Sequence, residues 1–236
     1  MAETDAVFDA MIEGGADVVE VEIPFSDPLA DGSTIQRAAE IALEQGVTPA
    51  DCLDFVRRAR SRHATTPIVF MTYLNPVLAY GLERFANDAA SAGADAFILT
   101  DLPPEEAGPA RQALGKAQLD LILLVAPTSS DERIELIGRE AGGFVYCVSV
   151  AGVTGARTDL PSGLADFVSK VRRSSTLPLA VGFGISRREH IESLTGVADG
   201  TVVGSAFMDV ISKNEASQRP RAVREYVETL RGKRSA

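Results

Sequence analysis

Three acidic residues near the start of the chain are the first candidates for chemistry. Glu20 and Glu22 interrupt the apolar run 18–23, and Asp31 follows in the turn-forming segment 25–32. Four of the six residues in that run are β-branched, which favours a buried strand. A carboxylate in such a strand is costly unless it is paired or used. Because a buried and a loop carboxylate can have different pKa values, Glu20 and Asp31 are predicted to form an acid–base pair.

Each acid also has a structural interpretation. Glu20 could be neutralised by a salt bridge, and Asp27 and Asp31 could simply build the turn. For Asp27 the turn is favoured, whereas for Glu20 catalysis is favoured, because packing does not account for two glutamates in six apolar residues. Side chains alternate along a strand, so Glu20 and Glu22 share a face about 7 Å apart. We therefore expect Glu22 to disfavour ionisation of Glu20.

Three glycine-containing turns predict an anion site. They are GVTG at 152–155, GFGIS at 182–186 and GS at 204–205, and each follows a predicted strand. Glycine lets the backbone approach a ligand closely, and free N–H groups at helix starts bind anions. Glycines also simply end strands, so each turn alone is a weak signal. Together they predict a phosphate site made mainly of backbone dipoles, since none of the three contains lysine or arginine.

Short apolar segments alternate with amphipathic segments along the whole chain, which is typical of a parallel sheet covered by helices. Without a dinucleotide-binding fingerprint or a P-loop, the repetition favours a (β/α)8 TIM barrel. Only about seven strands are predicted, and the chain opens on a helix. We therefore expect one α/β domain over residues 1–236, a TIM barrel that lacks its N-terminal first strand. The predicted strands are 18–23, 67–72, 96–100, 120–126, 144–148, 179–181 and 200–203, and the predicted helices are 3–13, 33–45, 49–62, 82–92, 105–116, one from about 130, 163–173, one from about 186, and 222–231.

Local signals mark several of the helix starts. The pairs Ser33–Gln36 and Ser186–Glu189 have the spacing of a capping box. Thr48, followed by proline, is a typical N-cap, and Ser130 or Asp131 is expected to cap the helix that begins near 130. The dipeptide 75–76, Asn-Pro, predicts a loop after the second strand.

Composition excludes several classes of protein. The net charge of −10 and the pI of about 4.8 argue against a nucleic-acid or anionic-membrane partner. Cys52 and Cys147 are too few for a disulfide scaffold or a structural zinc site. His63 and His190 are expected on the surface, and no metal cluster is apparent. No apolar run is long enough to span a membrane, and the N-terminus is unlike a signal peptide, so a cytoplasmic location is expected.

Several stretches resemble the tryptophan synthase alpha chain family. The most specific are EIPFSDPLADGSTIQ at 22–36, GVTGAR at 152–157, GFGIS at 182–186 and VGSAF at 203–207. Together with PIVFMTYLNPV, ILTDLP and LLVAPTS, they cover essentially the whole chain in the family's order. The resemblance implies a lyase of L-tryptophan biosynthesis that cleaves indole-3-glycerol phosphate to indole and glyceraldehyde 3-phosphate by a retro-aldol reaction.

The resemblance also implies roles for individual residues. Glu20 would be the general acid–base that protonates the indole ring carbon and helps to remove the glycerol hydroxyl proton. Asp31 would accept a hydrogen bond from the indole N–H and stabilise the developing positive charge. The other implied site residues are Gly155, Gly184, Gly204 and Ser205 at the phosphate, Ile98, Thr100, Leu124, Tyr146 and Phe183 around the indole, and Thr154 on the loop that closes over the site.

A partner is implied as well. The family usually works as an alpha2-beta2 heterotetramer with a beta chain that consumes the indole, and segments 24–28 and 73–77 would face that chain. Pyridoxal phosphate belongs to the beta chain, so this chain is expected to need no cofactor.

Three departures from the family pattern leave alternatives open. The family has a helix and a first strand before the point where this chain begins, glycine where Glu22 stands, and commonly proline where Ser33 stands. One alternative is a non-catalytic or weakly active alpha-like subunit that binds and modulates a beta chain. Another phosphate-binding barrel enzyme is disfavoured, because such enzymes often use a lysine at a strand end and none is present.

Overall fold

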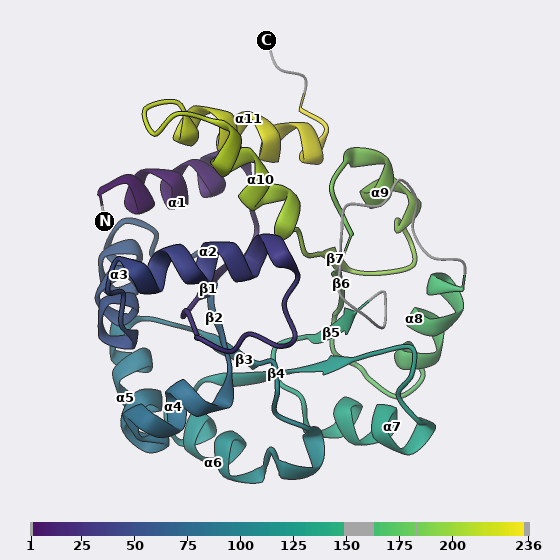
Figure 1. Ribbon diagram of the computed structural model, residues 1–236. Helices are drawn as coiled ribbons and strands as arrows, with labels where there is room; N and C mark the ends of the chain where they lie inside the picture. The colour runs from purple at the N-terminus through teal and green to yellow at the C-terminus, as the bar shows by residue number, and fades with distance from the viewer. Residues whose placement is uncertain (1, 149–162, 183, 234–236) are drawn as a thin grey trace.

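Seven parallel strands form one curled sheet in the order β1 to β7 (Figure 1). The computed structural model describes residues 2–148, 163–182 and 184–233. Strands that are neighbours in sequence are neighbours in the sheet, and every predicted strand is confirmed to within about two residues at each end. Within the described ranges, β1 pairs only with β2 and β7 only with β6. The strands are β1 (Val19–Glu22), β2 (Ile68–Thr72), β3 (Ala96–Leu99), β4 (Asp120–Val125), β5 (Val145–Val148), β6 (Leu179–Gly182) and β7 (Gly200–Thr201).

Helices connect the strands and cover the outer face of the sheet (Figure 1). Their bounds agree with the predicted ranges to within about three residues, but residues 74–80 and 205–213 form helices where a loop and a single helical turn are expected. In the described part of the chain, no helix is both long and apolar enough to cross a membrane. The helices are α1 (Ala2–Gly14), α2 (Ser33–Glu44), α3 (Pro49–Arg62), α4 (Leu74–Tyr80), α5 (Leu82–Ala92), the 3-10 helix η1 (Pro104–Glu106), α6 (Gly108–Lys116), α7 (Asp131–Glu140), α8 (Leu164–Arg172), α9 (Arg188–Ser193), α10 (Ser205–Lys213) and α11 (Arg219–Arg231).

Alternation along the strands separates two apolar clusters. The larger cluster lies between the sheet and the helices, where Phe70, Phe85 and Phe97 have ring centroids 5.4 to 6.2 Å apart. The smaller cluster fills the inside of the curl, because alternate residues on the same strands point the other way. Its buried members are Val69, Ala96, Ile98, Ile122 and Tyr146, with Met71, Leu124, Phe144, Val148 and Val202 packed against them.

The predicted loop after β2 is wrong, because residues 74–80 form α4. Pro76 lies in the first turn of this helix, where the backbone N–H has no intrahelical acceptor to lose. Proline is therefore compatible with a helix start as well as with a loop. The dipeptide Asn-Pro alone does not distinguish the two.

Two of the four predicted helix caps are also wrong, whereas Ser130 is confirmed as the N-cap of α7, since its hydroxyl accepts from the N–H of Arg133 at 3.3 Å. Gly32, and not Ser33, is the N-cap of α2, and the Gln36 amide donates to the backbone oxygen of Asp31 at 2.9 Å. Likewise, α9 begins after Arg187, with no side-chain cap. The cap at Thr48 is confirmed: its hydroxyl accepts from the third helical residue, whose carboxylate accepts from the Thr48 N–H at 2.9 Å.

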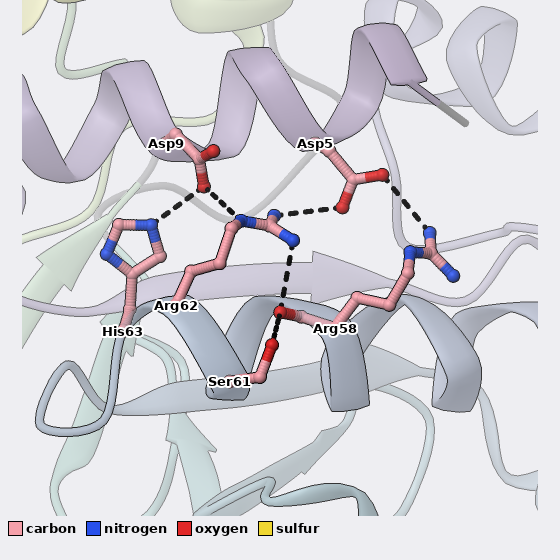
Figure 2. A network of polar contacts seen from close by, with 6 residues as sticks. All are labelled: Asp5, Asp9, Arg58, Ser61, Arg62 and His63. Carbon is pink, nitrogen blue, oxygen red and sulfur yellow. Dashed lines mark hydrogen bonds and ion pairs between the residues drawn. The ribbon is translucent and has the colours of Figure 1, made fainter.

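A polar network attaches α1 to α3 (Figure 2). Asp5 accepts hydrogen bonds from Arg62 at 2.9 Å and from Arg58 at 3.3 Å. Asp9 lies 2.7 Å from His63 Nε2 and accepts from Arg62 Nε at 3.1 Å. His63 is half-buried in this network, so its expected surface position is only partly correct.

Helix α11, near the C-terminal end of the described chain, packs against α1 at its N-terminal end. Val7 and Ala10 of α1 pack with Val223 of α11 in a third apolar cluster, which Phe207, Val210 and Ile211 of α10 also contact. A Cβ on Gly14 would lie 2.8 Å from Val227 Cβ, so the two helices approach very closely. Figure 1 shows α1, α10 and α11 together at one side of the molecule.

Candidate active site

Glu20 and Glu22 point to the inside of the curled sheet. Val19 and Ile23 belong to the cluster under the helices, and Val21 packs against it. The two glutamates alternate with these residues and therefore face the other way. In the parallel register Glu20 lies beside Val69 and Glu22 beside Met71, and both partners belong to the inner cluster.

Burial changes the acid–base properties of both glutamates. It raises the pKa of Glu20 to about 7. Burial also raises the pKa of Glu22 to about 8, with a further contribution from the negative charge of Asp31. At neutral pH Glu20 is therefore present in both protonation states, and Glu22 is mainly protonated. The raised pKa of Glu20 is caused by burial and not by the expected effect of the Glu22 carboxylate.

Asp31 lies on the loop above these glutamates and is bound by Tyr73. The residue is 6% exposed, and its carboxylate accepts a hydrogen bond from the Tyr73 hydroxyl at 2.7 Å. The same hydroxyl accepts from the N–H of Ala30 at 2.9 Å. Burial raises the pKa of Asp31, while the bond from Tyr73 partly opposes that shift.

Tyr73 is a site residue that sequence reasoning missed. It directly follows β2, and the carboxyl ends of parallel strands are where barrel enzymes place functional side chains. Its position directly after a predicted strand was the sequence feature that could have identified Tyr73 as a site residue. A polar aromatic residue at such a strand end can reach a loop acid from the neighbouring strand.

Four of the five residues predicted to surround the indole are described. Ile98 and Tyr146 are buried in the inner cluster, and Leu124 packs against it. Thr100 lies one residue beyond the end of β3, where its hydroxyl donates to the backbone oxygen of Thr72 at 3.2 Å. The fifth, Phe183, lies outside the described residues. The inner cluster thus places an apolar surface next to the acids.

Tyr146 links that apolar surface to the acids. Burial raises the pKa of Tyr146, and the negative charges of Glu20 and Asp31 raise it further, so all three groups face one region. A Cβ on Gly182 would lie 2.2 Å from the Tyr146 hydroxyl oxygen. The tyrosine ring can therefore occupy its position only because β6 has glycine there.

Of the three predicted phosphate-binding turns, 204–205 is described completely and 182–186 is described except at position 183. Gly184 follows β6 with a φ of +84°, a left-handed conformation that favours glycine. Gly204 is the N-cap of α10, and Ser205 is the first residue of that helix. Both turns follow neighbouring strands at the same edge of the sheet. Thr154 and Gly155, predicted on the third turn, lie outside the described residues.

The predicted surface position of His190 is wrong. This residue of α9 is only 4% exposed, with its Nδ1 3.3 Å from the backbone nitrogen of Ser186 and its Nε2 2.9 Å from Arg187 Nε. It is buried because α9 packs against the turn that precedes it. In the described part of the chain, no group of histidine, cysteine and acidic side chains is arranged to hold a metal ion.

Comparison with known proteins shows which family this chain resembles in sequence. The family model described as tryptophan synthase alpha chain matches residues 1–235. The tryptophan synthase alpha chain of Roseiflexus castenholzii is 50% identical over 233 residues, which are 98% of this chain and 89% of that relative.

Solved structures agree in fold. The crystal structure of the tryptophan synthase alpha subunit from Legionella pneumophila superposes with a TM-score of 0.90 at 37% identity, over 98% of this chain and 87% of that one. A structure of the tryptophan synthase α2β2 complex from Pyrococcus furiosus gives a TM-score of 0.90 at 35% identity, over 98% and 92% of the two chains. The curled sheet of seven parallel strands is thus the TIM-barrel fold of these proteins. This chain belongs to the tryptophan synthase alpha chain family.

Proposed function

We propose that this indole-3-glycerol-phosphate lyase of tryptophan biosynthesis uses Glu20 as its general acid–base. The observation that carries the proposal is the burial of Glu20 inside the sheet, which raises its pKa to about 7. A group with a pKa near the working pH can both give and accept a proton. Glu22, the other glutamate on the inner face of β1, has a higher pKa of about 8, which keeps it mainly protonated at neutral pH.

The reaction needs one proton delivered and one removed. Glu20 protonates the ring carbon that carries the glycerol phosphate chain, and its carboxylate form takes the proton of the neighbouring chain hydroxyl. The carbon–carbon bond then breaks and its electron pair returns to the ring. Indole and glyceraldehyde 3-phosphate are the two products, so atoms and protons balance.

Asp31 is proposed to stabilise the charge that develops on the ring. Its carboxylate would accept a hydrogen bond from the indole N–H, which becomes more acidic as the ring is protonated. The Tyr73 hydroxyl, 2.7 Å from that carboxylate, fixes its orientation. Ile98, Leu124 and Tyr146, with Thr100 and Phe183, would hold the ring against the inner face of the sheet.

The phosphate group is proposed to bind at the turns after β6 and β7. Gly184, Gly204 and Ser205 would contribute backbone N–H groups, and the start of α10 would add its favourable dipole. Gly155 would complete the cradle from the preceding turn, and Thr154 would lie on the loop that closes over the substrate. These assignments follow the family's motifs and the position of the two described turns.

The assembly and the complete barrel are also proposals. The Pyrococcus furiosus relatives occur in α2β2 complexes, and we propose that this chain likewise binds a beta chain, which carries the pyridoxal phosphate. Leu29 and Leu78, which are 89% and 53% exposed, lie beside the two segments that would face it. Tyr73 and Val77, within those segments, are buried. An eighth strand between β1 and β7 would complete a (β/α)8 barrel.

The test of the proposed chemistry is Glu20→Gln. Indole release from indole-3-glycerol phosphate is measured for wild type and variant, with and without a purified beta chain. We expect the variant to lose at least 100-fold in kcat while its Kd for inorganic phosphate, from calorimetry, changes less than two-fold. Glu44→Gln, an exposed carboxylate at the end of α2, is the matched control and should behave as wild type.

The outcomes separate the enzyme from its alternative. Equal activity of wild type and Glu20→Gln would refute the assigned role. A folded wild-type chain that releases no indole in either condition, but raises the activity of the beta chain, would support a modulating subunit. The one-sided pairing of β1 and β7 is the observation that favours this second candidate.

A further inference from the structure

A hydrogen bond joins α11 to the turn that follows β6. The Tyr226 hydroxyl donates to the backbone oxygen of Ser186 at 2.8 Å, across 40 residues of sequence. Ser186 ends the turn that contains Gly184, one of the proposed phosphate contacts. The tyrosine does not touch the acids or the inner apolar cluster, so the proposed chemistry leaves this bond unexplained.

The same helix also supports the second phosphate-binding turn. Val223, one turn before Tyr226, packs with Phe207, Val210 and Ile211 of α10. The N-terminus of α10 carries the other two proposed contacts, Gly204 and Ser205. α11 therefore contacts the last residue of the first turn and the helix that begins at the second.

A second link fixes α9 to the end of α11. Arg188 donates from Nη1 to the backbone oxygen of Leu230 at 3.2 Å and pairs with Glu192 at 2.7 Å within its own helix. The turn before α9 and the first residue of α9 are thus held to α11 at two points four residues apart along α11. Because there are two hydrogen bonds, they restrict rotation of the turn as well as its displacement.

We infer that Tyr226 is a positioning residue for phosphate binding, acting through the backbone of Ser186 to set the Gly184 turn against the start of α10. This inference rests on the proposed phosphate site. Backbone N–H groups bind an anion well only when several point at it simultaneously. The distance between the two turns then decides how well the anion is bound, and α11 contacts both Ser186 and α10.

The properties of Tyr226 suit this role. The residue is half-buried, and burial together with the negative charge of Asp209 on α10 raises its pKa to about 12. The hydroxyl therefore remains a donor throughout the neutral pH range. Without it the Ser186 carbonyl loses its partner in a partly buried position, and the turn is free to shift towards water.

The test is Tyr226→Phe, which removes one oxygen atom and keeps the ring. We expect KM for indole-3-glycerol phosphate to rise three- to ten-fold, the Kd for inorganic phosphate to rise by a similar factor, and kcat to change less than two-fold. Tyr80→Phe is the matched control, because it removes a 2.8 Å bond from a tyrosine hydroxyl to Asp88 far from both turns. The control should keep the wild-type KM and phosphate Kd.

Three outcomes would overturn the inference. One is an unchanged KM and phosphate Kd in Tyr226→Phe; another is equal changes in the two tyrosine variants. A lower melting temperature with unchanged KM would assign the hydroxyl to stability alone. A wild-type protein that does not bind phosphate, or a fully active Glu20→Gln variant, would instead refute the proposed function, so the two failures are distinguishable.

Discussion

Burial of Glu20 and Glu22 makes the stability of the protein depend on pH. In an unfolded chain both carboxyls have pKa values near 4.5, whereas in the folded protein the pKa values are about 7 and about 8. Between these limits the folded state binds more protons than the unfolded state. The free energy of unfolding therefore falls as the pH rises from about 5 to about 8.

At about 1.4 kcal/mol per pKa unit, we expect Glu20 to contribute about 3 kcal/mol and Glu22 about 5 kcal/mol to this fall, as upper values. Urea unfolding at pH 5, 6.5 and 8 measures it. The double variant Glu20→Gln/Glu22→Gln should have a much flatter pH profile and a greater stability than wild type at pH 8. Glu44→Gln should retain the wild-type profile, and an equally steep profile in the double variant would show that these carboxyls are not the cause.

At the scale of elements, close packing of α7 against the end of α8 depends on one glycine. A Cβ on Gly138 would lie 2.0 Å from the backbone oxygen of Ser174. We therefore expect Gly138→Ala to destabilise the protein by about 1–3 kcal/mol, because backbone atoms must move to make room. The measurement is the midpoint of urea unfolding.

Gly115 of α6 is the matched control for this prediction. A Cβ there would meet nothing within 4 Å, and the residue has helical geometry. Gly115→Ala should therefore stabilise the protein by up to about 1 kcal/mol, since alanine has the higher helix propensity. If both alanine variants shift the midpoint in the same direction, the close contact at Gly138 does not govern α7 packing.

The strands were predictable from the sequence, because their apolar residues recur at a regular spacing. Features that depend on a single polar contact, such as a helix cap, were not. All seven strands follow from short apolar runs. The cap at Ser33 failed because the Gln36 amide has backbone oxygens within reach and binds these instead of helping to cap α2. Tyr73 and His190 were missed for a related reason: their partners, Asp31 and Ser186, come from other elements.

The candidate site was predictable as far as its residues repeat a pattern along the chain. The alternation of side chains along β1 predicts Glu20 as a candidate, and the glycine-containing turns predict Gly184 and Gly204. The pKa values could not be predicted, because they depend on how completely the helices and the inner cluster remove each carboxyl from water. The coupling of Glu22 to Asp31, and not to Glu20, depends likewise on the path of the loop after β1.

At the scale of the whole molecule, the sheet has two edges within the described residues, at β1 and at β7. An unpaired edge leaves backbone N–H and C=O groups to water and exposes the apolar cluster beside it. The α1–α3 network and the packing of α1 on α11 hold the neighbouring helices in place but add no strand (Figure 2). The protein should therefore gain stability from a strand that pairs with β1.

We expect a version of the chain extended upstream by one apolar β-strand and a short linker to melt several degrees higher than the 236-residue chain. Each added backbone hydrogen bond contributes about 0.5–1.5 kcal/mol, and the strand would also cover part of the inner cluster. An extension of equal length rich in glycine and serine is the control, because it adds residues without strand propensity. Equal melting temperatures for the two extended chains would mean that the edge of β1 contributes no instability, and that completing the barrel is unnecessary for a stable fold.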